Sequence, residues 1–441
     1  MKTATALAQK SYRCIVGLDK THQTPFYKGN TSMNDILERC CGLDVHRDTI
    51  VACIMIGTDK IVKKEIKKFG TMTEDIRQLL NWLQQNDIKH VVIESTGIYW
   101  KPIFNILEGS IDIILANAAH VKNMPGRKTD VKDSEWLCML LKKGCVKRSF
   151  IPPADIRHLR ELTRYRKSSV QQLSSEKNRV IKVLESSNIK LSSVLSDVFG
   201  KSGWKIIQEL AQGVLKAEIL AKKMNANIKT SRKDFLKALE GTLTDSQVKL
   251  LAIMVQSIIS QETHITNIEQ QIREALRKYE SELTLLQSIP GAGEIVVATI
   301  IAEIGTDMEQ FPTEQHLASW AGLSPGNNES AGKKKSTRIL PGNKNLKVAL
   351  VEAAWAASKT KGTFFKATYA RFKRRMGAKK SLIAIAHKIL VTAYWMIKRK
   401  MSYCELGENY VTKKTLSTRT DYYKEQLVRL GFEVTLTSKP A

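Results

Sequence analysis

The first 150 residues alternate between two hydrophobic periods. Residues 43–57 and 60–70 combine β-branched side chains with near-alternating polarity, which predicts strands. Residues 71–86 and 97–109 change to a helical period, and short apolar strands are predicted at 90–95 and 111–117. A last helix is predicted from about Val131 to Gly144. The order of three strands, helix, strand, helix, strand, helix predicts a mixed α/β sheet with an antiparallel edge and a parallel remainder.

Residues 153–279 lose the strand pattern and are predicted to be helical. Apolar side chains recur at spacings of three, four and seven residues along residues 251–276, and a less regular apolar stripe runs along residues 159–184. Both segments predict long amphipathic helices that are able to pair as a coiled coil. The pattern is equally compatible with an intramolecular spacer and with an oligomerisation arm.

The third region begins near residue 281 and is mostly helical. Its IPGAG turn, Ile289–Gly293, resembles a helix-hairpin-helix element, whose backbone N–H groups can meet a phosphate, although such turns usually only connect helices. A Gly/Asn/Ser loop carrying Ser330 follows, and a helix resumes from Asn345. A serine in a glycine-bounded loop is usually a turn residue. Residues 1–40 and 403–441 contain no recognisable motif and stay unassigned.

Four carboxylates stand out against this scheme. Asp44 lies inside the first strand and Glu94 ends the strand at 90–95. Asp130 and Asp133, three residues apart at a helix start, have Cβ atoms about 5–6 Å apart on one face. Each acid alone has an ordinary explanation, as a strand-end rim residue or a first-turn acid that favours the helix dipole. Together they predict a converging site that requires a hard divalent cation, Mg²⁺ or Mn²⁺.

The charge of the chain points to a polyanionic partner. Among 441 residues, 70 Lys and Arg face 43 acidic residues, which gives a net charge of +27. Nucleic acid is the favoured partner, because no basic amphipathic anchor or membrane-spanning apolar run is evident. Seven cysteines without a CxxC pair predict reduced thiols of a cytosolic protein. The predicted phosphate contacts are Arg127, Lys128, Lys333, Lys334, Lys335, Arg338, Arg371, Lys373 and Arg374.

Six motifs, in this order, resemble the DEDD transposases of insertion sequences of the IS-one-ten group, which are also described as bridge-RNA-guided serine recombinases. The motifs are GLDVHRD, VVIESTGIYW, GRKTDVKDSEW, SIPGAG, LASWAGLSP and ESAGKKK. The resemblance runs from about Cys41 to Lys400. It implies a RuvC-like, ribonuclease H-type domain over 41–150, a helical coiled-coil connector over 151–280, and a C-terminal transposase domain over 281–402.

The resemblance also implies roles for individual residues. Asp44, Glu94, Asp130 and Asp133 match the family's metal-binding acids, and Ser330 matches its catalytic serine. The implied reaction is site-specific strand exchange through a serine–DNA phosphodiester, aided by Mg²⁺. The implied partners are donor and target DNA, a structured guide (bridge) RNA, and further copies of the chain in a dimer or tetramer, with acids and serine supplied by different protomers. The implied location is the cytoplasm of a bacterium or archaeon, at the nucleoid.

Two alternatives stay open. The first is a metal-dependent nuclease of the Holliday-junction type, in which water is the nucleophile and Ser330 is structural. The second is a non-catalytic nucleic-acid-binding protein with a vestigial acidic site, against which the presence of all four acids argues.

Overall fold

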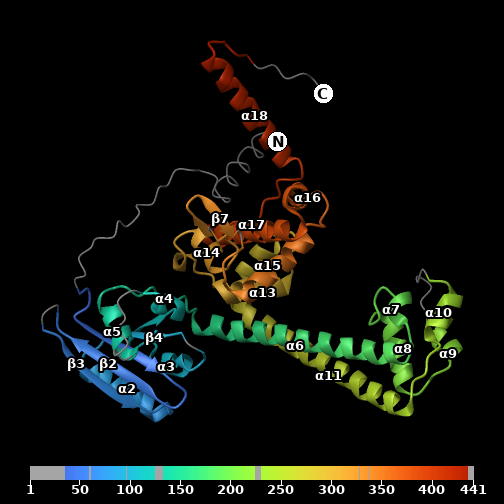
Figure 1. Ribbon diagram of the computed structural model, residues 1–441, viewed down its shortest axis with the longest axis horizontal. Helices are drawn as coiled ribbons and strands as arrows, with labels where there is room; N and C mark the ends of the chain where they lie inside the picture. Colours follow the sequence, from blue (N-terminus) through green and yellow to red (C-terminus); the bar gives the residue numbers. More distant parts are fainter. Residues whose placement is uncertain are drawn as a thin grey trace. The chain divides into compact units, whose positions relative to one another are not determined.

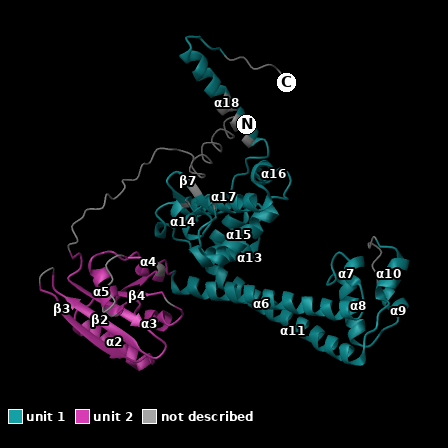
Figure 2. Cartoon of the chain, viewed as in Figure 1, with its two compact units in different colours: residues 1–20, 152–441 teal, residues 21–151 magenta. Residues whose placement is uncertain are grey.

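The computed structural model describes residues 35–58, 61–95, 97–124, 133–223, 230–326, 328–336 and 338–435. These residues divide into two compact units, which are 35–151 and 152–435 (Figure 2). The first unit contains a sheet with helices, and the second is mostly helical (Figure 1).

The first unit is built on a five-stranded sheet of order β3-β2-β1-β4-β5. The strands are β1 (Arg39–Val45), β2 (Ile50–Ile56), β3 (Lys63–Phe69), β4 (His90–Glu94) and β5 (Asp112–Ala116). β1, β2 and β3 pair antiparallel, whereas β1, β4 and β5 pair parallel. The predicted mixed sheet is therefore confirmed. Residues 43–57 contribute to two strands, because the chain turns between β1 and β2, where the His46 N–H donates to the Thr49 carbonyl at 2.9 Å.

Helices cover both faces of this sheet. One face packs on α2 (Thr73–Gln85) and α3 (Trp100–Leu107), in a core that includes Leu43 of β1. The other face packs on α4 (Ala118–Lys122) and α5 (Asp133–Lys142), in a core that includes Cys40. Successive side chains of a strand point to opposite faces, so β1 is buried on both sides. This explains its nearly continuous apolar sequence.

A glycine brings α5 directly onto β1. A Cβ atom on Gly42 would lie 2.2 Å from the Ser134 carbonyl oxygen and 2.5 Å from the Cys138 backbone nitrogen. Both atoms belong to the α5 backbone, so only glycine allows this approach. Gly42 is two positions before Asp44, and the α5 helix begins at Asp133. The contact therefore fixes the height of α5 over the strand that carries Asp44.

The second unit begins with a long helix pair. α6 (Ala154–Ser186) and α11 (Asp245–Leu276) pack along each other in opposite directions (Figure 1). The ion pairs Arg166–Glu269 and Lys177–Glu262 join them at 2.6 and 2.8 Å. The helices between them share a core with the far end of the pair. They are α7 (Leu191–Val194), α8 (Lys201–Ala211), α9 (Ala217–Ala221) and α10 (Arg232–Leu239). The connector pairs within one chain, and its coiled-coil character stays a prediction.

The rest of the second unit is helical apart from one hairpin. Its elements are α12 (Glu280–Gln287), α13 (Glu294–Ile304), α14 (Glu314–Trp320), β6 (Asn328–Ser330), β7 (Lys333–Ser336), α15 (Lys344–Ala357), α16 (Phe364–Met376), α17 (Ala378–Arg399) and α18 (Tyr410–Arg429). The predicted turn connects α12 and α13, and Gly291 in it has φ +86°. Among the described residues, only α17 has the length and composition to cross a membrane, and most of it is buried inside the unit.

A buried carboxylate joins α6 to these C-terminal helices. Glu303 of α13 is fully buried and accepts two hydrogen bonds from Arg164 of α6, both 2.8 Å long. Arg160 of α6 lies 3.4 Å from the same carboxylate and donates to the Ala302 and Glu303 carbonyls. The Asn343 side chain donates to Glu303 at 2.6 Å, while its oxygen caps the first turn of α15. One carboxylate therefore holds three helix segments together.

Candidate functional site

Asp44 and Glu94 lie side by side at one edge of the sheet. β1 and β4 run parallel with Leu43 paired to Ile93, so the next residue of each strand, Asp44 or Glu94, lies at the carboxyl end. Asp133 begins α5, which packs on β1. The strand positions of Asp44 and Glu94 and the helix-start position of Asp133 are as predicted. Asp130, Arg127 and Lys128 lie outside the described residues, so the proposed pairing of Asp130 with Asp133 is untested.

The negative charges of Asp133 and Glu94 act on the Asp44 carboxylate. The pKa of Asp44 is raised, first by its burial and also by the negative charges of Asp133 and Glu94. His46 acts in the opposite direction, since its Nε2 lies 3.2 Å from the Asp44 carboxylate. The Asp44 side chain is 25% exposed, so solvent screens this repulsion only in part. A cation at this edge would relieve it.

The donor chemistry of this edge fits a hard divalent cation, because carboxylate oxygens are the ligands that Mg²⁺ prefers. No group of three or more His, Cys, Asp or Glu side chains is close enough to hold a metal within the part of the chain that the structure describes. The fourth acid of the predicted set, Asp130, falls in the gap at residues 125–132. The metal and its ligand set therefore stay proposals.

Ser330 lies in a β-hairpin of the second unit, where the sequence predicted a loop. It ends β6 and pairs with Lys333, the first residue of β7, across a turn made by Ala331 and Gly332. Both turn residues have positive φ, +50° and +75°, as a two-residue turn between right-twisted strands requires. Residues directly opposite in an antiparallel pair share a face. The exposed Ser330 side chain therefore lies on the same hairpin face as the side chain of an exposed lysine.

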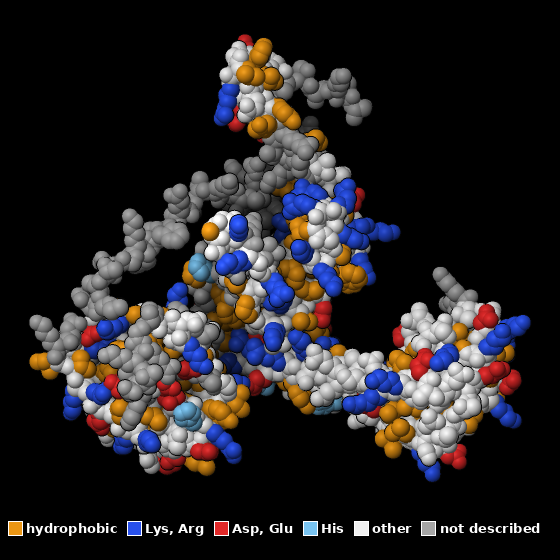
Figure 3. Space-filling view, in the orientation of Figure 1, with side chains coloured by type: hydrophobic (Ala, Val, Ile, Leu, Met, Phe, Trp, Pro, Cys, Tyr) orange, Lys and Arg blue, Asp and Glu red, His pale blue; other side chains and the backbone are white. Residues whose placement is uncertain are grey.

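The other predicted phosphate contacts fall on two surfaces of the second unit. Lys333, Lys335 and Arg338 are exposed on the hairpin, and the side chain of Lys334 is not described. Arg371, Lys373 and Arg374 are exposed on α16, where Figure 3 shows Lys and Arg side chains gathered. None of these six described side chains has an Asp or Glu within ion-pair distance among the residues described. These two sets of exposed cations are therefore available to phosphates, and their contact with nucleic acid stays a prediction.

Two residues were not predicted. His46 lies beside Asp44, and its signal is spacing, because it follows Asp44 by two residues, directly after the end of β1 at Val45. Arg375 is exposed next to Arg374 and, like Arg371, has its guanidinium about 6 Å from the Phe372 ring centre, at 5.8 and 5.6 Å respectively. Its signal is the uninterrupted basic run at the end of α16.

Comparisons with known proteins agree with this arrangement. A family model described as a transposase matches residues 41–189, which include all four predicted acids. A second, described as "Transposase IS116/IS110/IS902 family", matches residues 283–370, which include Ser330.

Individual relatives match the chain in part. A pilin gene-inverting protein of Moraxella bovis is 30% identical over 141 residues, which are 31% of this chain and 44% of that protein. The transposase for insertion sequence element IS1111A of Coxiella burnetii is 25% identical over 169 residues, 36% of this chain and 45% of that protein. The chain thus spans less than half the length of these relatives. With both family models in chain order, this chain belongs to the IS116/IS110/IS902 family of transposases.

Proposed function

We propose that this protein is a DNA transposase or recombinase that exchanges strands at defined sites through a serine–DNA phosphodiester. The observation that carries the proposal is that Asp44 and Glu94 lie at the carboxyl ends of adjacent parallel strands and that the charge of Asp133 acts on Asp44. Carboxylates meeting at one strand edge suit metal-assisted phosphoryl transfer. Two of the relatives are named for gene inversion and for transposition.

In this proposal Ser330 is the nucleophile. Its Oγ loses a proton and bonds to the scissile phosphorus, while the bond from that phosphorus to the leaving DNA oxygen breaks and the oxygen takes up a proton. A hydroxyl of another strand then attacks the phosphoserine, which restores the phosphodiester and frees Ser330. Lys333, opposite Ser330 in the hairpin, neutralises charge on the phosphate.

The four acids complete the site. Asp44, Glu94, Asp133 and Asp130 would hold Mg²⁺ or Mn²⁺, which supplies positive charge to the phosphoryl group. The ring nitrogen of His46 restrains the Asp44 carboxylate. The described acids belong to one compact unit and Ser330 to the other. This division is compatible with a site whose acids and serine come from different protomers of a dimer or tetramer.

The proposed partners are donor DNA, target DNA and a structured guide RNA. A net charge of +27 suits a protein that neutralises several nucleic-acid strands. If base pairing by the RNA selects the sites, the protein needs mainly backbone contacts, which the exposed cations of the hairpin and α16 can make. The proposed location is the bacterial or archaeal cytoplasm, at the nucleoid.

A covalent adduct tests the proposal. Reactions of the full chain with donor and target DNA, Mg²⁺ and RNA that co-purifies with the protein are stopped in denaturant and examined for protein-linked DNA. Wild type should give the adduct, and Ser330→Ala should give neither adduct nor cleavage while still binding both nucleic acids. Ser336→Ala, on the other strand of the hairpin, is the matched control and should keep the adduct.

The two alternatives predict different results. A nuclease that uses water would cleave without linked DNA and would keep its full rate in Ser330→Ala. A non-catalytic binder would bind DNA and leave it intact with every metal tried. Either result would refute the serine mechanism.

A further inference from the structure

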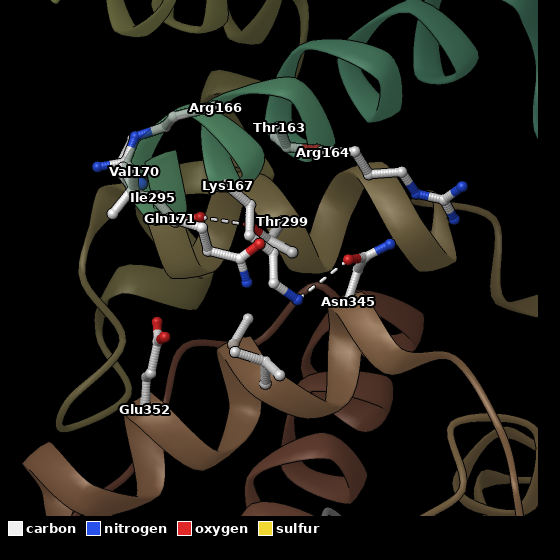
Figure 4. A pocket seen from close by; sticks show the side chains of 12 residues that line it. Thr163, Arg164, Arg166, Lys167, Val170, Gln171, Ile295, Thr299, Asn345 and Glu352 are labelled. Atoms are coloured by element: carbon white, nitrogen blue, oxygen red, sulfur yellow. Dashed lines mark hydrogen bonds between the residues drawn. The ribbon is translucent and has the colours of Figure 1, made fainter. Parts of the chain in front are cut away.

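A pocket with several polar and charged side chains in its lining lies between α6, α13 and α15 in the second unit. Its volume is about 160 Å³, room for roughly five waters at ~30 Å³ each. Figure 4 shows Lys167 and Gln171 pointing from α6 into the pocket, whereas Arg164 and Arg166 point away to either side. Asn345 and Glu352 project from α15 on the opposite wall (Figure 4).

The ion pairs of the pocket leave one charge of each sign without a partner. Arg164 is bound to Glu303 and Arg166 to Glu269. Lys167 donates only to the neutral Asn345 side chain, at 3.1 Å. Among the residues that the structure describes, neither Lys167 nor Glu352 forms an ion pair, with each other or with any other side chain. Lys167 is half-buried, so its ammonium loses part of its hydration without gaining a carboxylate.

These two charges specify the chemistry of a ligand. A lysine facing a pocket in a chain of net charge +27 suits a backbone phosphate. The Glu352 carboxylate repels phosphate and accepts only from a donor. In a nucleic-acid backbone, the 2′-hydroxyl of ribose is such a donor, and deoxyribose lacks it.

We propose that this pocket binds a ribose–phosphate unit of an RNA strand, with Lys167 on the phosphate and Glu352 accepting from the 2′-hydroxyl. Gln171 and Asn345 supply further polar groups beside the sugar. The pocket thus distinguishes RNA from DNA at one position of the bound strand. The proposal rests on the proposed function only for the class of ligand, nucleic acid, and needs no strand exchange.

The test is binding, in a Ser330→Ala background that removes the proposed chemistry. The probes are labelled oligouridylate, the matching oligodeoxyuridylate, and 2′-O-methyl oligouridylate, which keeps the 2′ oxygen but cannot donate. Lys167→Gln should weaken binding of all three and reduce the salt slope by about 0.7, the value for one phosphate on a single strand. Lys177→Gln is the control. Lys177 lies on α6, like Lys167, but it is already paired with Glu262 of α11.

Relative to the other two probes, Glu352→Gln should weaken the RNA probe by about fivefold, because the amide oxygen accepts a weaker hydrogen bond from the 2′-hydroxyl than the carboxylate does. Loss of the charge that repels phosphate should affect all three probes alike. Lys167→Arg should keep binding, which separates loss of charge from loss of folding. A Lys167→Gln effect no larger than that of Lys177→Gln would remove the phosphate assignment. Equal effects of Glu352→Gln on RNA and DNA would remove the ribose assignment. Neither result bears on the serine mechanism. Conversely, a wild-type protein that forms no covalent adduct would refute the serine mechanism without bearing on this pocket.

Discussion

Glu303→Gln should loosen the junction between α6 and the C-terminal helices. The substitution keeps the side-chain volume but leaves Arg160 and Arg164 facing an amide, and turns one of its two acceptor oxygens into a donor near Asn343. Removing one member of a buried pair costs ~3–5 kcal/mol. Arg160 is 16% and Arg164 45% exposed, so Arg164 can rehydrate, and we expect the lower end, about 3 kcal/mol.

Native-state hydrogen exchange is the assay, because it reports local opening in a protein with two compact units. A loss of about 3 kcal/mol should raise exchange of the α13 and α15 amides by roughly a hundredfold. Glu262→Gln is the control, since its pair with Lys177 is exposed and such pairs contribute about 0–1 kcal/mol. If both variants change exchange equally, or if the α15 amides are unaffected, the reasoning about Glu303 is wrong.

Three other perturbations address the acids, the glycine and the charge. Asp44→Asn should raise the melting temperature of the metal-free first unit, because the pKa of folded Asp44 lies above its unfolded value and its ionised form therefore costs stability above that pKa. Mg²⁺ should then stabilise wild type but not this variant in calorimetry, and equal responses would contradict the metal proposal. Gly42→Ala should destabilise the first unit by about 3 kcal/mol in urea unfolding, whereas Gly293→Ala, whose added Cβ meets no atom within 4 Å, should change stability far less. Duplex-DNA affinity should fall steeply with salt, at about −0.9 in log–log slope per neutralised phosphate, and a flat response would exclude the cations as a binding surface.

The placement of Asp44 and Glu94 at the carboxyl ends of two strands could be predicted, because it depends on local sequence patterns and on the order of the strands. The apolar runs around Asp44 and Glu94 identify buried strands, and the parallel order brings their carboxyl ends together. The Ser330 hairpin was missed because β6 and β7 are short and polar, and Ala-Gly lacks the usual Asn-Gly or Asp-Gly signal of a tight hairpin turn. The apolar stripe that predicts α6 and α11 is the same whether a helix pairs with a helix of its own chain or with one of another chain. The sequence therefore could not predict that these two helices pair within one chain. Lys167 and Asn345 are 178 positions apart, so only tertiary structure reveals their pocket.

The α6–α11 pair sets a length scale for whatever the second unit binds. α6 has 33 residues, and a rise of ~1.5 Å per residue makes it about 50 Å long. Its N-terminal third is held at Glu303 through Arg160 and Arg164, and its last turns carry the core shared by α7, α8 and α10. At ~3.4 Å per base pair, this distance matches about 15 base pairs of B-form duplex. A duplex that lies along α6 and contacts both of its ends must therefore extend over about one and a half turns of its own double helix.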